Sequence, residues 1–314
     1  MLSPKRFTWL ILLLLVFTTL FSGCQQSSSV SGGATDGLKV IAVETFLADI
    51  AQNVAGDRVK VESLIPAGLD PHAFEPTPLD ITRVAQSQVL IINGAGLEAW
   101  LSKVLDNVGG QRQVIEAAAG LTSRLSDASE PVGDNQAGNP HFWMNPLNVI
   151  QYVQNIRDGL SLADPAGKVN YSRNADLYIN RLKDLDAWIA QQVAAIPPAE
   201  RLLVTDHEDL GYFADRYGFK IIGTILPGTS SESSPSAQQI ANLIKMILQS
   251  GVPAIFLETG TDPRLADQIA AETKVKVVNN LYTHSLTSSG GKAPTYIDMM
   301  RYDTQIIVEA LAHP

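Results

Sequence analysis

The longest uninterrupted helical pattern lies near the middle of the 314-residue chain. Asp164-Pro165 supplies a helix-capping residue followed by a proline, which suits the first position of a helix. Apolar residues then recur at steps of three and four, at Ala175, Tyr178, Leu182, Leu185, Ile189 and Val193, until Pro197-Pro198. Some 30 helical residues would span about 45 Å. This is either a long surface helix or a stiff rod between two lobes, and we favour the rod.

Strand-like and helix-like segments alternate on both sides of this pattern. Before it, strands are expected at 38–43, 59–65 and 89–92, and helices at 46–54, 78–86 and 98–108. After it, strands are expected at 201–205, 220–226, 254–257 and 275–278, and helices at 210–217, 236–250, 263–273 and about 295–312. Such alternation is typical of α/β proteins with parallel sheets. We therefore predict two mostly parallel-sheet α/β lobes, at 38–163 and 198–314, joined by one long rigid helix at 164–197.

The first residues have the features of a targeting segment. Lys5 and Arg6 precede an apolar run at 7–21, which is shorter than a membrane span but suits a signal peptide at 1–23. The run ends in Ser22-Gly23-Cys24, which resembles a bacterial lipobox, although an ordinary secretory signal with an incidental cysteine is the alternative. Residues 24–37 are rich in Ser and Gly and would form a flexible tether. We expect an extracytoplasmic protein, lipid-anchored at Cys24 to a bacterial membrane, in the periplasm or on the outer face of the cytoplasmic membrane.

Composition limits the partners and the chemistry. The net charge is −9 and the pI is near 5.0, which disfavours binding to nucleic acid. Cys24 is the only cysteine, so an internal disulfide is impossible and no thiolate of the folded part can bind a metal. No second apolar run reaches the length of a membrane helix. We expect a monomer.

Four histidines stand alone, roughly 70 residues apart, in short polar or proline-containing segments: His72, His141, His207 and His284. A lone histidine is more often structural than a ligand, but two of these follow apolar strands closely. In open α/β sheets, ligand-binding residues gather beyond the carboxyl ends of the strands. Imidazole is the commonest ligand for zinc, which takes four nitrogen or sulfur donors. The fold would therefore bring these loops together around a metal ion.

Several motifs in a consistent order resemble one known family. They are Glu44-Thr45-Phe46-Leu47-Ala48-Asp49-Ile50, the segment 66–78 around His72, His141-Phe142-Trp143-Met144-Asn145-Pro146, Thr205-Asp206-His207, Leu281-Tyr282-Thr283-His284, and the segment 296–302. From residue 38 to the end, the chain resembles the zinc- and manganese-specific substrate-binding lipoproteins of ABC importers, most of all the zinc-uptake type. The resemblance implies metal in the cleft between the lobes, no enzymatic activity, and an ABC membrane permease with its ATPase as the partner.

The resemblance also implies the ligands. His72 and His141 fall where the family has two histidine ligands of the first lobe. His207 falls where zinc members have histidine and manganese members usually have glutamate. His284 falls where the family generally has aspartate, so this chain departs from the pattern. Zinc members often carry a His-rich acidic loop in the first lobe, but the corresponding stretch here, about 123–138, contains no histidine.

Four imidazoles would move the site away from Mn²⁺, which prefers carboxylate, toward Zn²⁺, copper, nickel or cobalt. Alternatively, His284 is not a ligand and leaves a position open for water. Four neutral ligands leave the charge of the ion uncompensated, and buried charge is costly without partners. Nearby acids that would orient the imidazoles are Asp70, Glu75, Asp206, Glu208 and Glu258. Each could instead be a solvated surface group; Glu258 is the best candidate because it ends an apolar strand. His313 has no expected role.

Other classes of function fit the sequence less well. A zinc hydrolase would need a base near the metal, and Glu208 beside His207 is the candidate, but no HExxH motif exists. A serine hydrolase would need a G-x-S-x-G elbow, which is absent. An adhesin would have no use for the ligand set. The sequence thus predicts a receptor that captures Zn²⁺ for uptake and has no catalytic residues, with a manganese-binding protein of the same family as the main alternative.

Overall fold

The computed structural model describes residues 37–124 and 138–312, all within one compact unit at 34–314. The predicted signal peptide, the lipidation site Cys24, the tether at 24–36, residues 125–137 and His313 lie outside the described residues. Within the described part, no helix combines the length and the apolar character that crossing a bilayer requires.

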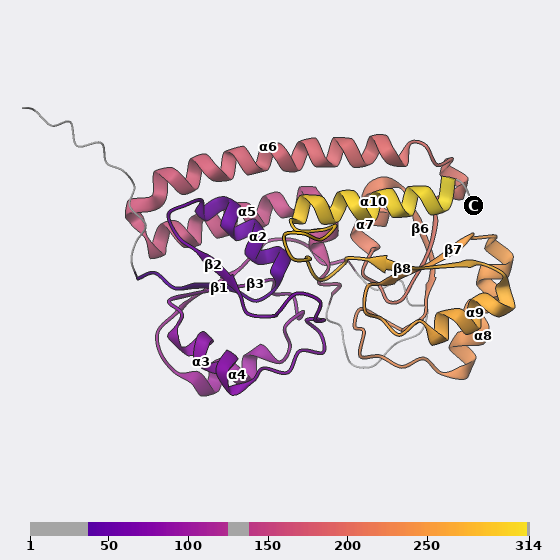
Figure 1. Cartoon of the computed structure of the whole chain (residues 1–314), viewed down its shortest axis with the longest axis horizontal. Helices are drawn as coiled ribbons and strands as arrows, with labels where there is room; N and C mark the ends of the chain where they lie inside the picture. The colour runs from indigo at the N-terminus through magenta and orange to yellow at the C-terminus, as the bar shows by residue number, and fades with distance from the viewer. Residues whose placement is uncertain (1–36, 125–137, 313–314) are drawn as a thin grey trace, which may run out of the picture. The chain divides into compact units, whose positions relative to one another are not determined.

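The first lobe is built on a four-stranded parallel sheet of order β2-β1-β3-β4, of which Figure 1 labels β1, β2 and β3. The strands are β1 (Val40–Ala42), β2 (Val61–Ser63), β3 (Val89–Ile92) and β4 (Gln113–Glu116). Its helices are α2 (Thr45–Ala55), α3 (Pro78–Gln86), α4 (Leu101–Val108) and α5 (Pro146–Ala163). Successive residues of β1 point to opposite faces: Val40 and Ala42 join the core under α2 and α5, whereas Ile41 joins the core under α3 and α4. Both faces are covered, as parallel sheets require.

The second lobe repeats this plan. Its parallel sheet has the order β6-β5-β7-β8. The strands are β5 (Leu202–Thr205), β6 (Lys220–Thr224), β7 (Ala254–Glu258) and β8 (Lys276–Leu281). The helices are α7 (Gly211–Tyr217), α8 (Ala237–Ser250), α9 (Arg264–Thr273) and α10 (Tyr296–Ala312). The predicted fold class, two parallel-sheet α/β lobes, is confirmed.

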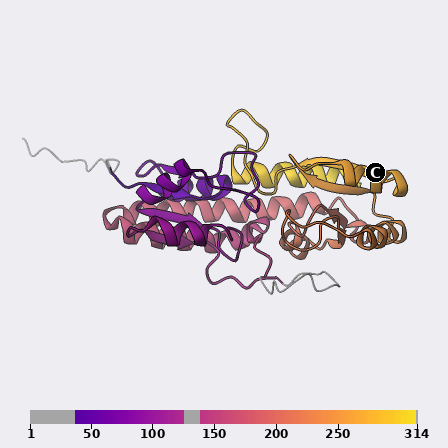
Figure 2. The same ribbon diagram turned by 90° about the horizontal axis from the view of Figure 1, so that it is seen from below.

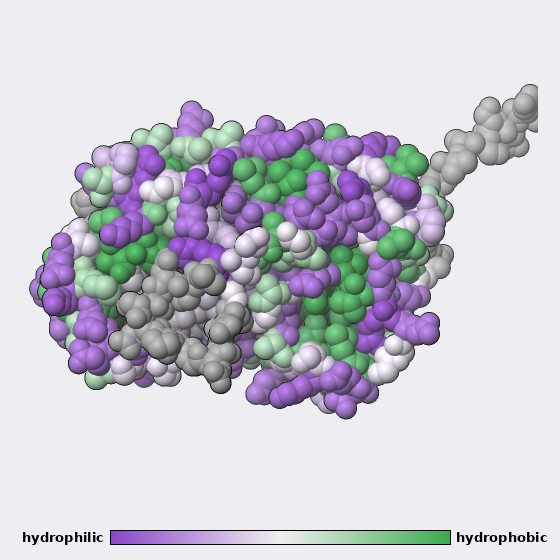
Figure 3. All heavy atoms as spheres, turned by 180° about the vertical axis from the view of Figure 1, so that it is seen from behind, coloured by the Kyte–Doolittle hydropathy of each residue, from purple (hydrophilic) through white to green (hydrophobic). Residues whose placement is uncertain are grey.

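The long helix α6 (Lys168–Val193) runs alongside both lobes (Figures 1 and 2). It contacts α2 and α5 of the first lobe and α7 and α10 of the second. Its buried face is the apolar stripe seen in the sequence, from Ala175 to Val193. The opposite face is exposed and includes the apolar Val169 and Leu177. The surface of the molecule seen from behind likewise mixes hydrophilic and apolar side chains (Figure 3). The helix can therefore serve as a common support for both lobes.

The predicted ends of this helix were too wide. Pro165–Gly167 and Pro198–Glu200 form separate 3₁₀ turns that flank the α-helix. Asp164 makes no side-chain capping bond there, because its carboxylate accepts hydrogen bonds from Arg58 and from the Tyr171 hydroxyl. That ion pair fastens the start of α6 to the loop that precedes β2.

Two elements were absent from the sequence-based prediction. Strand β4 is a short edge strand in which only Ile115 is buried, and α5 is an 18-residue helix whose start is capped by Asn145. The predicted helix at 98–108 also begins later, at Leu101; Glu98 lies before it, and its carboxylate accepts the backbone N–H groups of Asn93 and Gly94.

Candidate metal centre

The four histidines come from four loops, two in each lobe. His72 lies between β2 and α3, and His141 stands just before the 3₁₀ turn Phe142–Met144 that leads into α5. His207 follows β5, and His284 follows β8, so both stand beyond the carboxyl ends of strands in the second sheet. His72 is partly exposed and the other three are buried. The structure thus brings together four residues that the chain separates by up to 212 positions, since 284 − 72 = 212.

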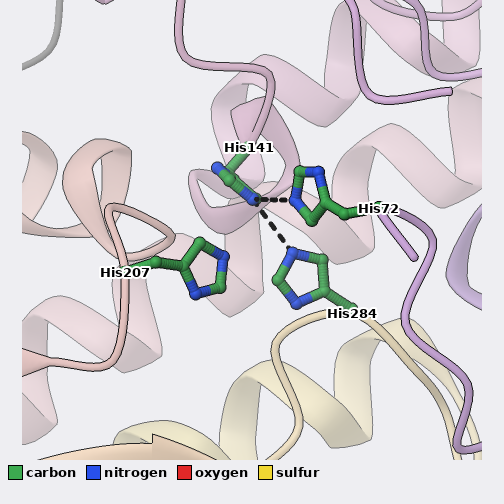
Figure 4. Close-up of side chains that lie close together, drawn as sticks. All are labelled: His72, His141, His207 and His284. Carbon is green, nitrogen blue, oxygen red and sulfur yellow. Dashed lines mark hydrogen bonds between the residues drawn. The ribbon is translucent and has the colours of Figure 1, made fainter. Parts of the chain in front are cut away.

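Their ring nitrogens converge on one point between the lobes (Figure 4). One nitrogen from each ring lies within 4.8 Å of the others. The Nε2 atom of His141 is 3.2 Å from that of His72 and 2.9 Å from that of His284. Tetrahedral zinc, with Zn–N bonds of about 2.0–2.1 Å, holds its donors roughly 3.3 Å apart. The spacing therefore suits a small tetrahedral cation with modest adjustment.

In His141, His207 and His284, a hydrogen bond at Nδ1 fixes Nε2 as the nitrogen that faces the centre. Asn139 donates from Nδ2 to the backbone carbonyl of Glu208, so its Oδ1 faces the Nδ1 of His141, 2.8 Å away. An amide oxygen only accepts, so Nδ1–H is the donor and the Nε2 of His141 keeps its lone pair for the centre. Asn139 was missed by the sequence analysis; its place two residues before His141 was the available signal.

In the second lobe, carboxylates take the place of Asn139 as the partners of Nδ1 in His207 and His284. Asp206 Oδ1 lies 3.1 Å from Nδ1 of His207, and Glu258 Oε2 lies 2.8 Å from Nδ1 of His284. Glu258 Oε1 also accepts the backbone N–H of His284 at 2.9 Å. The Nε2 atom of His207 is buried and has no hydrogen-bond partner within the described ranges. A buried lone nitrogen without a partner is costly unless a cation occupies the centre.

The other acids named from the sequence divide into three cases. Asp70 accepts the backbone N–H of His72 at 2.8 Å and the hydroxyl of Ser231 from the opposite lobe. Glu75 is exposed and makes no hydrogen bond to any of the four histidines in the described part of the chain. Glu208 is buried, and its backbone carbonyl, through Asn139, helps to hold His141.

Asp209 is an acid that the sequence analysis overlooked. It is 2% exposed, and its ligand atom lies within 4.8 Å of those of Asp206 and His207. Its Oδ1 atom has no hydrogen-bond partner within the described residues. Burial, the largest influence, and the charge of Asp206 raise the pKa of Asp209 to about 6. The signal was an acid two residues after a candidate ligand and directly before the apolar Leu210.

The two histidines of the first lobe and the two of the second lobe have opposite pKa shifts. Burial, together with the charges of the other imidazoles, lowers the pKa of His72 to about 3 and that of His141 well below its usual value. Burial also acts to lower the pKa of His207, but Asp206 and Asp209 outweigh it and raise this pKa to about 10. At His284, burial acts to lower the pKa, but Glu258 outweighs it, so this pKa is also raised. A cation at this centre would therefore meet neutral imidazoles on the first lobe and would have to displace protons from the second-lobe pair.

A cavity of about 780 Å³ opens beside the centre. It is lined from both lobes, by Gly68, Asp70 and Ala73 on one side and by Asp206, Glu258 and Thr261 on the other. Across the lobes, the Gly68 N–H donates to Ser285 Oγ at 2.7 Å, and the Leu286 N–H donates to Thr45 Oγ1 at 2.8 Å. These bonds hold the lobes closed over the histidines.

Two α/β lobes on a shared helix, with a histidine cluster where they meet, are the architecture of a two-lobed binding protein. Residues 40–310 match the family described as zinc-uptake complex component A, periplasmic, and the chain belongs to that family. This confirms the resemblance seen in the sequence.

Known relatives cover nearly the whole chain. The manganese-binding lipoprotein MntA of Halalkalibacterium halodurans is 30% identical over 299 residues, which are 95% of this chain and 97% of the relative. Among solved structures, the Mn-bound periplasmic metal binding protein of Candidatus Liberibacter asiaticus is 29% identical, with a TM-score of 0.78. The periplasmic zinc binding protein TroA of Treponema pallidum is 25% identical, also with a TM-score of 0.78. Each of these two structures covers 87% of this chain, and 99% of its own chain is matched.

Proposed function

We propose that this protein is an extracytoplasmic receptor that captures Zn²⁺ with His72, His141, His207 and His284 and delivers it to an ABC permease and its ATPase. Family membership supports a metal-binding component of an importer. It leaves the metal open, because one relative is named for manganese and another for zinc. The ligand set carries the choice: four imidazole nitrogens, with no carboxylate oxygen in the group of four.

Donor chemistry favours zinc over manganese in such a set. Mn²⁺ has the lowest affinity of the first-row divalent ions for nitrogen donors and prefers carboxylate and water. Zn²⁺ accepts four imidazoles in a tetrahedron without a geometric penalty. Copper, nickel and cobalt would also bind nitrogen, but Cu²⁺ and Ni²⁺ favour square-planar or tetragonal donors over a tetrahedron.

Capture and release follow from the division of ligands between lobes. A cation bound by all four histidines ties the second-lobe pair to the first-lobe pair, so it favours the closed arrangement. Parting the lobes would separate the two pairs and break the bonds from Gly68 to Ser285 and from Ser231 to Asp70. A permease that prefers the open form would therefore lower the affinity for zinc and release it. The long helix α6, in contact with helices of both lobes, is the natural fixed element of that motion.

Anchoring is part of the same proposal. We propose cleavage of residues 1–23, lipidation of Cys24 and a flexible tether at 24–37, with a monomeric receptor beyond it. The domain limits become a first lobe at 38–163, a linking segment at 164–197 and a second lobe at 198–314. The name lipoprotein carried by the relative MntA supports the anchor. Labelling with a radioactive fatty acid, and its loss in Cys24→Ser, would test it.

The metal is tested by competition. Purified protein without residues 1–24 is stripped with a chelator, and Zn²⁺ and Mn²⁺ affinities are measured against a chromophoric chelator at pH 7.5. We expect one equivalent of tightly bound zinc and at least about a thousandfold preference over manganese, given the order of affinities for nitrogen donors. Equal affinities, or a preference for manganese, would refute the proposed specificity.

A further inference from the structure

Hydrogen bonds fasten the loop of His141, which belongs to the first lobe, to the second lobe. Asn139, two residues before His141, donates from Nδ2 to the backbone carbonyl of Glu208 at 2.5 Å. The backbone carbonyl of Asn139 accepts the hydroxyl of Tyr212 at 2.7 Å. Glu208 and Tyr212 both follow His207 in the second lobe. The loop of His141 is therefore held against the loop of His207.

A second connection joins the same loop to the loop of His284. Trp143, two residues after His141, donates from Nε1 to the backbone carbonyl of Thr283 at 2.7 Å. The backbone carbonyl of Trp143 accepts the hydroxyl of Tyr296, the first residue of α10, at 2.6 Å. Both aromatic side chains are fully buried, so the bonds are shielded from water. The loops of three of the four histidines are thus bonded to one another.

His72 is attached differently. It lies on the irregular segment 66–77, which is fastened to the first lobe where Trp100 Nε1 donates to the Pro71 carbonyl at 3.1 Å. Within the described residues, no group bonds the Nδ1 atom of His72. His72 is partly exposed, whereas the other three histidines are at most 2% exposed. It is the least restrained ligand of the four.

Segment 66–77 meets the second lobe at the mouth of the cleft. Gly68 donates its N–H to Ser285 Oγ at 2.7 Å. The hydroxyl of Ser231 donates to the carboxylate of Asp70. All four of these residues line the cavity beside the centre, so water can replace both bonds when the lobes part. A parting motion will therefore break these bonds before the buried ones.

We propose that Asn139 and Trp143 are positioning residues, which hold three of the ligands together when the lobes part. His72 is then the ligand that leaves the ion first and rejoins it last. This inference rests on the proposed function and refines its release step, because the four ligands separate unequally. Three protein ligands and a water are a common coordination for zinc, so the partly open receptor would still hold the ion, but less tightly.

Rates of zinc binding and release distinguish His72 from the other ligands. Dissociation is timed in stopped flow with excess chromophoric chelator at pH 7.5, and dividing its rate constant by Kd gives the association rate constant. In His72→Ala, dissociation should accelerate at least about a hundredfold, whereas association should stay within about threefold of the wild type. His141→Ala is the matched comparison, because it removes the same ring from the set of three; it should slow association at least about tenfold.

Two further variants leave all four ligands in place. Trp143→Phe keeps an aromatic ring and removes the N–H that holds Thr283, so association should slow at least about tenfold as preorganisation is lost. Ser231→Ala removes the bond to Asp70 at the mouth of the cleft, so dissociation should accelerate roughly tenfold at an unchanged association rate. Ser234→Ala, at an exposed position of the same loop, is the control and should change neither rate.

A cluster whose four ligands assemble together would behave differently. Association would then slow by the same factor in His72→Ala and His141→Ala, and that equality would overturn the proposal. A wild-type association rate in Trp143→Phe would also overturn it, even with a lower melting temperature, since Trp143 would then be merely structural. A wild type that prefers manganese to zinc would overturn only the proposed function, because the same rates can be measured with manganese.

Discussion

Replacing His284 by aspartate tests both the fourth ligand and the reason for the metal preference. The change puts a hard oxygen donor and a negative charge in place of the imidazole. At an effective dielectric of about 20, a carboxylate about 4 Å from a divalent ion attracts it by about 8 kcal/mol. The new group would also face Glu258, which now lies 2.8 Å from Nδ1 of His284. In the metal-free variant two carboxylates about 3.5 Å apart would share a proton, because their repulsion is about 5 kcal/mol on the same scale, and the ion would have to displace that proton.

The difference, about 3 kcal/mol, corresponds to a gain of roughly a hundredfold for any divalent ion. For manganese the oxygen donor adds to that gain, so His284→Asp should raise manganese affinity by at least roughly a hundredfold. For zinc the loss of a nitrogen donor offsets it, so zinc affinity should change by less than about tenfold. Chelator competition at pH 7.5 with both ions measures these shifts. His284→Ala is the matched control: it should weaken zinc without improving manganese, since water would take the vacant position. Manganese affinity within threefold of the wild type in His284→Asp would show that His284 is not a ligand.

Three further predictions concern pH and the helix α6. Zinc affinity should fall steeply between pH 7.5 and pH 5.5, since the ion must displace the protons of His207 and His284, whose pKa values are raised, whereas His72 and His141 are already neutral; a flat profile in the same titration would exclude His207 and His284 as ligands. Arg58, the leading cause, holds the pKa of Asp164 at about 2, below its value in the unfolded chain, so the pair stabilises the fold above about pH 4. Asp164→Asn should therefore melt earlier than the wild type at pH 7, and the two melting temperatures should converge as the pH falls from about 4 to about 2. Leu182 is 0% exposed and Leu177 is 60% exposed on the same helix. In urea unfolding Leu182→Ala should cost about 2–5 kcal/mol and Leu177→Ala less than about 0.5 kcal/mol, and equal losses would mean that the buried face is misassigned.

The large features of this fold were accessible from the sequence because each depends on a local pattern. The apolar stripe on α6 repeats over five turns, and the strands of both sheets are short β-branched runs between helices. Strand β4 was missed because it is an edge strand in which only Ile115 is buried. Helix α5 carried a readable signal, with Asn145 before Pro146 and apolar residues from Val149 to Leu160 at helical spacing. Its omission was an error of interpretation rather than a limit of the sequence.

Part of the candidate site could also be predicted from the sequence, but from the topology of parallel sheets rather than from a local pattern. Parallel strands deliver their carboxyl ends to one edge, so His207 and His284 could be expected to meet. The choice among nearby acids depends on which side chains face inward, and adjacency along the chain does not decide that. Glu75 is three residues from His72 yet exposed, whereas Glu258 is 26 residues from His284 and contacts its ring. Asp209 illustrates the same limit, because it is only 2% exposed and its place in the chain, two residues after His207, does not show this.

X-ray absorption at the zinc edge tests the central claim most directly, because it counts the donors around the bound ion. Protein loaded with one equivalent of zinc should show four nitrogen neighbours at about 2.0–2.1 Å and the outer-shell scattering of imidazole rings. The His284→Asp variant should lose one imidazole from that count and gain an oxygen. A wild-type spectrum with three imidazoles and an oxygen, or with five or six light neighbours, would contradict an all-histidine zinc centre.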